Sequence, residues 1–223
     1  MTARGTYRLK FIVFATILAC IMNAAIAKSH SKQTNSSDHF LDEIQQMAQN
    51  GDISAQRKLG LIYLTGPAVE SNLERARHWL EKAANKNDLE AQKSLGRIYA
   101  EGLGVKIDLS KSVEFFKLAA AQGDAIAEAF LGQAYEKGFG VKVNYSSAAK
   151  WYNRAAEKGN ANGQFGLGGL YYRGFGTVQN FIEAFRFYQQ AALKGHPDAN
   201  YMIAVMFEKG QGVEKNEEKR KKR

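Results

Sequence analysis

Serine and lysine three residues apart form the pattern in this sequence that could most directly support catalysis. The S-x-x-K pattern occurs at Ser147–Lys150 and again at Ser29–Lys32, and in penicillin-interacting enzymes its serine is the nucleophile. Those enzymes also carry S-D-N and K-T-G motifs, and this sequence contains neither. We therefore expect Ser147 and Lys150 to lie on the solvent side of a helix, and we predict no catalytic residues.

Metal and cofactor chemistry have equally little support in the sequence. The histidines are His30, His39, His78 and His196. None belongs to an H-E-x-x-H motif or has a second ligand at metal spacing. A recurring G-x-G is never extended to the G-x-G-x-x-G that binds dinucleotides after a strand. We expect neither a metal nor a cofactor, and we interpret G-x-G as a turn.

The elements that carry these residues repeat with a period of 36 residues. Shifting the segment Glu90–Val105 (EAQKSLGRIYAEGLGV) forward gives IAEAFLGQAYEKGFGV, then NGQFGLGGLYYRGFGT, then DANYMIAVMFEKGQGV. One backward shift gives SAQRKLGLIYLTGPAV. No gap is needed, which is typical of repeat architectures.

The first half of each unit is predicted to be a helix. Its small and apolar residues recur at i, i+4, i+7 and i+8, which is one face of a helix: Ala91, Leu95, Ile98 and Tyr99. Gly96 recurs beside this face although glycine disfavours helix interiors, which indicates a close approach of the neighbouring helix. Gly102 and Gly104 then end the helix and supply a turn with positive φ.

The second half is predicted to be another helix. A short polar residue precedes it at a fixed register, where its side chain can cap the free N–H groups: Asn72, Asp108, Asn144, Asn180 and Asn216. An apolar face follows: Ser112, Phe115, Phe116, Ala119 and Ala120. Glycine closes the unit at Gly123, Gly159 and Gly195.

The pattern A-x-x-x-L-G-x-x-Y-x-x-G-x-G-V, followed by D/N, Ala, Trp-Tyr and A-A-x-x-G, resembles the Sel1-like repeat family, a relative of the tetratricopeptide repeats. The resemblance covers residues 51–213 and implies an all-α, right-handed solenoid of helix-turn-helix units. The units start near residues 51, 87, 123, 159 and 195, and the last is incomplete. Gly66-Pro67-Ala68 and Ile203-Ala204 depart from the pattern, which affects local turns and packing rather than the fold.

The first 27 residues resemble a secretory signal. A basic stretch precedes the apolar run Phe11–Met22 and the small-x-small site Ala25–Ala27, and the run is shorter than the about 20 residues that span a bilayer. We predict cleavage after Ala27 and a periplasmic or secreted protein. Membrane contact is expected only if the segment is retained as an anchor, or if Cys20, which ends a loose lipobox, is lipidated.

The termini differ in composition from the repeats. Residues 28–37 are polar and predict a flexible tether, residues 38–50 predict an amphipathic capping helix, and residues 214–223 predict a basic polar tail. Much of the net charge of +9 lies in the signal and the tail. The charge therefore gives little support to nucleic-acid binding.

A partner is expected on the first helices, which usually line the concave surface of a helix-pair solenoid. Positions two, six and nine residues after the repeat alanine point away from the core stripe. They include our candidate partner-binding residues, basic early and aromatic late: Arg57, Leu61, Lys93, Arg97, Gln133, Phe165, Tyr172 and Tyr201. Arginine and aromatic side chains are favoured at interfaces. The alternative is that the lysine and arginine side chains are ordinary solvated residues and that the aromatic rings pack between repeats.

The first helix of the fourth unit is unusually rich in glycine: Gly163, Gly166, Gly168 and Gly169. Either neighbouring side chains stabilise it, which we favour, or a ligand backbone approaches closely there.

These observations predict a non-catalytic, monomeric scaffold that binds a protein or peptide. The resemblance implies roles in envelope regulation or host-cell interaction. Two alternatives are a β-lactam- or peptidoglycan-acting enzyme, since some cysteine-rich relatives are linked to β-lactamase activity, and an outer-membrane lipoprotein scaffold.

Overall fold

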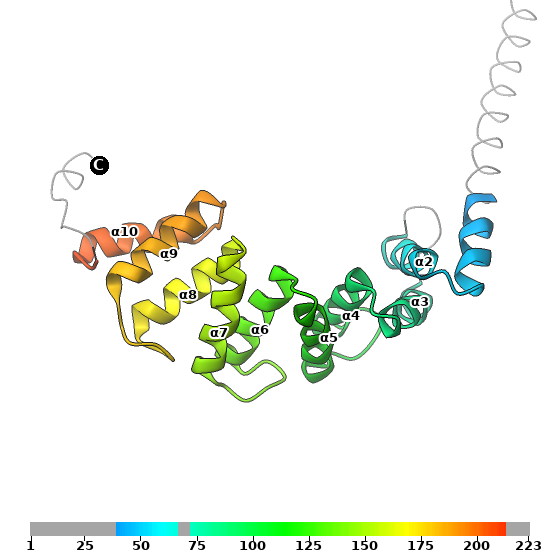
Figure 1. Cartoon of the computed structure of the whole chain (residues 1–223), viewed down its shortest axis with the longest axis horizontal. Helices are drawn as coiled ribbons and strands as arrows, with labels where there is room; N and C mark the ends of the chain where they lie inside the picture. The colour runs from blue at the N-terminus through cyan, green and yellow to red at the C-terminus, as the bar shows by residue number, and fades with distance from the viewer. Residues whose placement is uncertain (1–38, 67–71, 213–223) are drawn as a thin grey trace, which may run out of the picture. The chain divides into compact units, whose positions relative to one another are not determined.

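A computed structural model describes residues 39–66 and 72–212, and within these ranges the regular structure is helical (Figure 1). The predicted signal, tether and tail lie outside the described residues, as do Cys20 and Asn216.

The helices follow the 36-residue period. A helix at residues 39–49 comes first. It is followed by α2 (Ile53–Thr65), α3 (Leu73–Asn85), α4 (Leu89–Glu101), α5 (Leu109–Ala121), α6 (Ala125–Lys137), α7 (Tyr145–Glu157), α8 (Ala161–Arg173), α9 (Phe181–Leu193) and α10 (Ala199–Lys209). The even-numbered helices are the first helices of their units, and the odd-numbered ones are the second helices.

The chain divides into two compact units at Leu59 and Gly60. In the N-terminal unit the helix at residues 39–49 buries Ile44 and Ala48. The Gln56 amide Nε2 donates a hydrogen bond of 3.0 Å to the Ala48 carbonyl oxygen. This helix lies within the range predicted for a capping helix.

In the larger unit, helices adjacent in the sequence pack against one another from α3 to α10, and α6 also contacts α8. The predicted core stripe of α4 is confirmed, because Ala91, Leu95, Ile98 and Tyr99 are at most 5% exposed. Packing between neighbours along the chain is what defines a solenoid, so the predicted all-α solenoid is confirmed.

The predicted helix ends are also confirmed. The first helices α4, α6, α8 and α10 end at glycines in the left-handed conformation: Gly102, Gly138, Gly174 and Gly210. The second helices begin at side-chain caps: Asn72, Asp108, Asn144 and Asn180. The start of α10 is different, because the side chain of Asp198 at its N-cap position makes no capping hydrogen bond.

Glycines inside the first helices make room for second helices. A Cβ at Gly96 would lie 2.8 Å from the Phe116 ring, and one at Gly132 would collide with the Tyr152 ring. In the fourth unit, a Cβ at Gly163 would lie 2.5 Å from Ala155, and Gly166 faces the Tyr152 ring. Neighbouring side chains therefore account for the glycines of α8 that pack against α7, as we favoured.

Candidate functional site

The serine and lysine of the S-x-x-K pattern sit at the start of α7. The backbone N–H of Ser147 donates to the Asn144 Oδ1 atom at 2.9 Å, as part of the helix cap, and Lys150 is exposed. Among the described residues, no group of three His, Cys, Asp or Glu side chains could hold a metal ion. Within the same ranges, no helix is both long and apolar enough to cross a bilayer.

The predicted basic residues differ in the exposure and the ion pairing of their side chains. Lys93 is only 18% exposed and bonds to Glu90 at 2.9 Å and to Asp124 of the next unit at 3.2 Å. Burial lowers the pKa of Lys93, but these two carboxylates outweigh it, so the net pKa is raised. Arg97 is 67% exposed and lies 3.3 Å from Glu101.

The early residues of the N-terminal part are partly buried. The Arg57 guanidinium lies 3.3 Å from the Ser54 hydroxyl within the N-terminal unit. Leu61 packs against the core that contains Leu80 and Leu95.

The predicted aromatic residues fall into two groups, those that pack against other side chains and those that are exposed. The Phe165 ring stacks on the His196 ring with centroids 4.0 Å apart. The Tyr172 ring meets Phe181 edge-on at 5.5 Å, and its hydroxyl donates to the Gln211 Oε1 atom at 2.9 Å. Both rings are partly buried against other side chains of the chain.

Tyr201 is instead an exposed aromatic residue, with 70% of its surface accessible. Gln133 is exposed as well. Arg97, Gln133 and Tyr201, on α4, α6 and α10, are the predicted residues that remain open to a partner. We call these three residues the first-helix face.

A buried ionic cluster that joins two first helices and the second helix between them was missed. Glu136 is 8% exposed, and its carboxylate accepts hydrogen bonds from Arg173 at 2.7 Å and from the Tyr152 hydroxyl at 2.8 Å. The clue in the sequence is that Tyr152 adds a hydroxyl at the register of Leu80 and Phe116. The cluster joins α6, α7 and α8.

The pKa of Glu136 makes this cluster pH-sensitive. Desolvation raises the pKa, but the hydrogen bonds from Arg173 and Tyr152 outweigh it and hold the pKa below its usual 4.5. A carboxyl with a depressed folded-state pKa stabilises the fold fully above its unfolded pKa, and the stabilisation is lost as pH falls through the folded pKa.

We therefore expect urea midpoints to fall as pH is lowered below 4.5, and to fall less steeply in Glu136→Gln. At neutral pH this variant should be less stable by about 1.5–3 kcal/mol, since hydrogen bonds to a charged group are lost. Equal pH slopes in both proteins would contradict the assignment.

A second missed feature is a buried polar register one residue after the repeat alanine. It contains Gln56, Gln92, Glu128 and Gln164, all at most 5% exposed. The Gln92 Oε1 atom accepts from the Gln122 amide at 2.8 Å. The Glu128 carboxylate, fully buried, accepts from Arg154 at 2.9 Å and from Lys158 at 2.7 Å.

Two members of this register differ. The Oε1 atoms of Gln56 and Gln164 have no hydrogen-bond partner among the described residues. A buried acceptor without a donor destabilises a fold by about 1–3 kcal/mol, and both oxygen atoms have almost no accessible surface.

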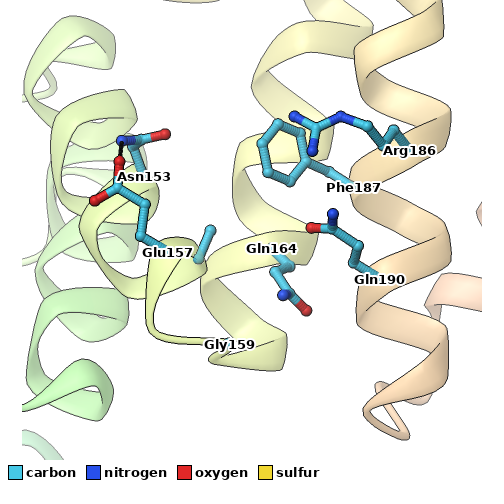
Figure 2. Close-up of a pocket in the computed structure, with 8 residues that line it drawn as sticks. Asn153, Glu157, Gly159, Gln164, Arg186, Phe187 and Gln190 are labelled. Atoms are coloured by element: carbon cyan, nitrogen blue, oxygen red, sulfur yellow. Dashed lines mark hydrogen bonds between the residues drawn. The ribbon is translucent and has the colours of Figure 1, made fainter.

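The Gln164 side chain lines a pocket of about 460 Å³, within the range of ligand-binding pockets. Figure 2 shows Arg186, Phe187 and Gln190 of α9 on one side, Asn153 and Glu157 of α7 on the other, and Gln164 of α8 between them. Ala156 and Gly159 complete the lining. Its wall is mixed, with one aromatic ring, three side-chain amides (one each from α7, α8 and α9), and one charge of each sign.

Helix pairs stacked through small residues, with positive-φ glycine turns, define an α-solenoid. The Sel1 repeat model matches residues 53–88, 89–124, 125–160, 161–196 and 197–219. The chain belongs to the Sel1 repeat family. A comparison with curated proteins finds no match.

Two solved structures are similar over much of the chain. A protective antigen of uropathogenic Escherichia coli strains, c5321, is 37% identical over 78% of this chain, with a TM-score of 0.75. A Sel1 repeat protein from Oxalobacter formigenes is 31% identical over 74%, with a TM-score of 0.66. The matched parts are 38% and 48% of those two proteins, so this chain spans less than half of their length.

Proposed function

We propose that this protein is a non-catalytic scaffold that binds a protein or peptide partner in the bacterial envelope or outside the cell. The observation that carries the proposal is a continuous stack of Sel1 repeats whose first helices keep exposed anchor-type side chains. Arg97 and Tyr201 are 67% and 70% exposed, and both residue types are enriched in binding hot spots.

The candidate partner-binding residues have different parts in this proposal. The first-helix face (Arg97, Gln133 and Tyr201) contacts the partner. Four other candidate residues support this surface and do not contact the partner directly, because their side chains pack against or bond to other parts of the chain: Phe165, Tyr172, Lys93 and Leu61. Arg57 adds positive charge in the N-terminal unit.

The proposed location is periplasmic or secreted. The predicted signal segment with its site at Ala27 supports it. The similar protein from uropathogenic E. coli strains is a protective antigen. Retention of the anchor, or lipidation of Cys20, would give the same scaffold a membrane attachment.

Affinity capture from envelope extracts, with partners identified by mass spectrometry, tests the proposal. A partner retained by the native chain should be lost by the triple variant Arg97→Ala, Gln133→Ala, Tyr201→Ala. Truncating a hot spot weakens binding by about 2 kcal/mol, roughly thirtyfold in Kd. The helical content and urea midpoint of the variant should stay near native, because all three side chains are exposed.

A matched control removes three exposed side chains from second helices: Lys117→Ala, Gln189→Ala and Leu193→Ala. It should keep the partner. Equal loss in both variants would contradict the first-helix face, and nitrocefin hydrolysis that disappears in Ser147→Ala would contradict the non-catalytic assignment.

A further inference from the structure

The turns that join the first helix of a unit to its second helix carry exposed apolar side chains. Between α6 and α7, Phe139 and Val143 are 40% and 50% exposed, and between α8 and α9, Val178 is 87% exposed. A single exposed apolar residue is ordinary on a protein surface, whereas a contiguous group of them marks an interaction site. What these residues do therefore depends on whether they lie next to one another.

These turns and the helix starts beside them form one continuous edge of the larger unit. A Cβ on Gly140 would meet the backbone of Leu109 at the start of α5, and one on Gly176 would meet the backbone of Tyr145 at the start of α7. Each turn thus lies against the first turn of the preceding second helix, and the rings of Tyr145 and Phe175 meet with centroids 4.7 Å apart. We call the exposed apolar residues along this line the turn edge: Phe139, Val143, Tyr145, Phe175, Val178 and Ile182.

Cations are interleaved with these apolar side chains. Lys142 is exposed in the turn between α6 and α7, and the Arg173 guanidinium lies over the Phe175 ring, 5.0 Å from its centroid. The buried Glu136 carboxylate pairs with both Arg173 and Lys137, so one negative charge stands against two positive ones. Residues 137–143 and 173–179 contain no acid. The turn edge is therefore both apolar and positively charged.

We infer that the turn edge docks on a bilayer surface that contains anionic phospholipid. The apolar side chains enter the boundary between head groups and acyl chains, as amphipathic surface segments do. Lys142 and Arg173 remain at the level of the lipid phosphates, which attract basic residues near the surface. Tyr145 has the amphipathic ring that is enriched at membrane interfaces.

The arrangement of the turn edge suits lipid better than a protein. Its side chains stand one after another along a line of turns, and lipids rearrange around such separate points, whereas a protein interface requires a closely packed, complementary surface. Glu183, the acid next to Ile182, is paired with Arg186 through a hydrogen bond of 2.9 Å, so its charge is compensated within the chain. The inference rests on the proposed function only in placing the protein beside a membrane.

The test mixes the purified full chain with large vesicles and measures the bound fraction by co-sedimentation. Vesicles of equal parts phosphatidylglycerol and phosphatidylcholine should bind the chain. Vesicles of phosphatidylcholine alone should bind it at least about fivefold less, the factor that one basic residue contributes near an anionic surface. Added salt should weaken binding to the anionic vesicles because it screens these charges. Equal binding to both kinds of vesicle, or no binding to either, would overturn the inference.

Two matched triple variants locate the contact. Val143→Ser, Val178→Ser and Ile182→Ser together should weaken binding to the anionic vesicles by about tenfold or more, because less apolar surface leaves water. The control changes three aliphatic residues of similar exposure near the opposite helix ends and should bind as the native chain does: Leu118→Ser, Ile126→Ser and Leu193→Ser. Every variant keeps the same N-terminal segment, so a difference between them reports on the turn edge. Equal weakening in both would contradict it.

Val178→Trp gives a readout that does not depend on the stability of a triple variant. In vesicles that contain brominated phospholipid, the fluorescence of the new indole should be quenched, because the indole enters the interface. Leu193→Trp is the control, since Leu193 is also 87% exposed but lies at the other end of α9. Trp79 and Trp151 contribute the same background to both proteins. Equal quenching in the two variants would show that the turn edge is not the side that meets the lipid.

Lys142→Gln tests the charge. It should weaken binding to the anionic vesicles by about fivefold and leave binding to neutral vesicles unchanged. Lys117→Gln removes an exposed lysine of α5 that lies outside the turn edge, and its affinity should stay near native. Equal losses would mean that only the net charge of the chain matters, which would contradict a defined docking edge.

A protein interface is the competing outcome. If the variant of Val143, Val178 and Ile182 loses the captured protein partner while the native chain binds no vesicles, the turn edge contacts a protein and the inference is wrong. Failure of vesicle binding leaves the proposed scaffold role standing, because that role is measured by partner capture with the first-helix variants.

Discussion

Replacing Arg154 and Lys158 together with methionine is expected to lower the free energy of unfolding by about 3–5 kcal/mol, because it leaves a buried carboxylate without a counter-ion. That carboxylate belongs to Glu128, which is fully buried, whereas Arg154 and Lys158 are 49% and 39% exposed. Methionine keeps much of the aliphatic length of both side chains. It removes the Arg154 guanidinium from above the Trp151 ring and the hydrogen bond from Lys158 to the Gly123 carbonyl oxygen, so a control must separate these losses from that of the unpaired charge.

The two single variants should each lose far less than half of this amount. Either cation alone still pairs with Glu128, since Lys158 donates to both carboxylate oxygens, at 2.7 and 2.8 Å, and Arg154 donates to one. Residues that share one partner are expected to be strongly non-additive.

Glu128→Gln supplies the decisive control. Added to the double variant, it removes the unpaired charge and should restore most of the lost stability, as a neutral amide already occupies this register in Gln92 and Gln164. Urea denaturation of the five proteins (the native chain, both single variants, the double variant and the double variant with Glu128→Gln) measures these differences. Additive single losses, or no rescue by Glu128→Gln, would show that the carboxylate is not what the two cations stabilise.

The repeating features were predictable from the sequence because each depends on contacts within one unit. The stripe of Ala91, Leu95, Ile98 and Tyr99 follows from helical periodicity alone. Asn144 and Gly138 act on their own helix ends, so local chemistry specifies them. Repetition at a fixed spacing then turned these local inferences into a solenoid.

The features that were missed depend on which side chain of another unit covers a given position. Phe165 and Tyr172 were predicted from helix geometry to point away from the core, yet Phe165 stacks on His196 and the Tyr172 hydroxyl donates to Gln211. Gln164 is polar and lies outside the apolar stripe, yet it is 5% exposed. Periodicity identifies the apolar face of a helix but not how far the next unit extends over the polar one.

The glycines of the G-x-G turns combine a feature that the sequence predicts with one that only the structure shows. Their positive φ was predictable, but the structure adds a contact. A Cβ on the second glycine would collide with the first turn of the preceding second helix: at Gly140 it would lie 2.2 Å from the Leu109 carbonyl oxygen, and at Gly176 2.3 Å from the Tyr145 carbonyl oxygen. Backbone atoms at a helix start cannot move aside as a flexible side chain can.

Gly176→Ala is therefore expected to destabilise the chain by about 3 kcal/mol, the sum of a left-handed alanine and an overpacked contact. Gly195→Ala is the matched control. Its φ of +80° is close to the +69° of Gly176, but a Cβ there would meet nothing within 4 Å.

The control should lose only about 1–2 kcal/mol, the cost of the left-handed backbone alone. The difference between the two urea midpoints then isolates the close approach of the turn to α7. Equal losses would mean that the turn moves away from Tyr145 freely, and that the second glycine of the repeat serves its φ angle and not the packing of one unit on the next.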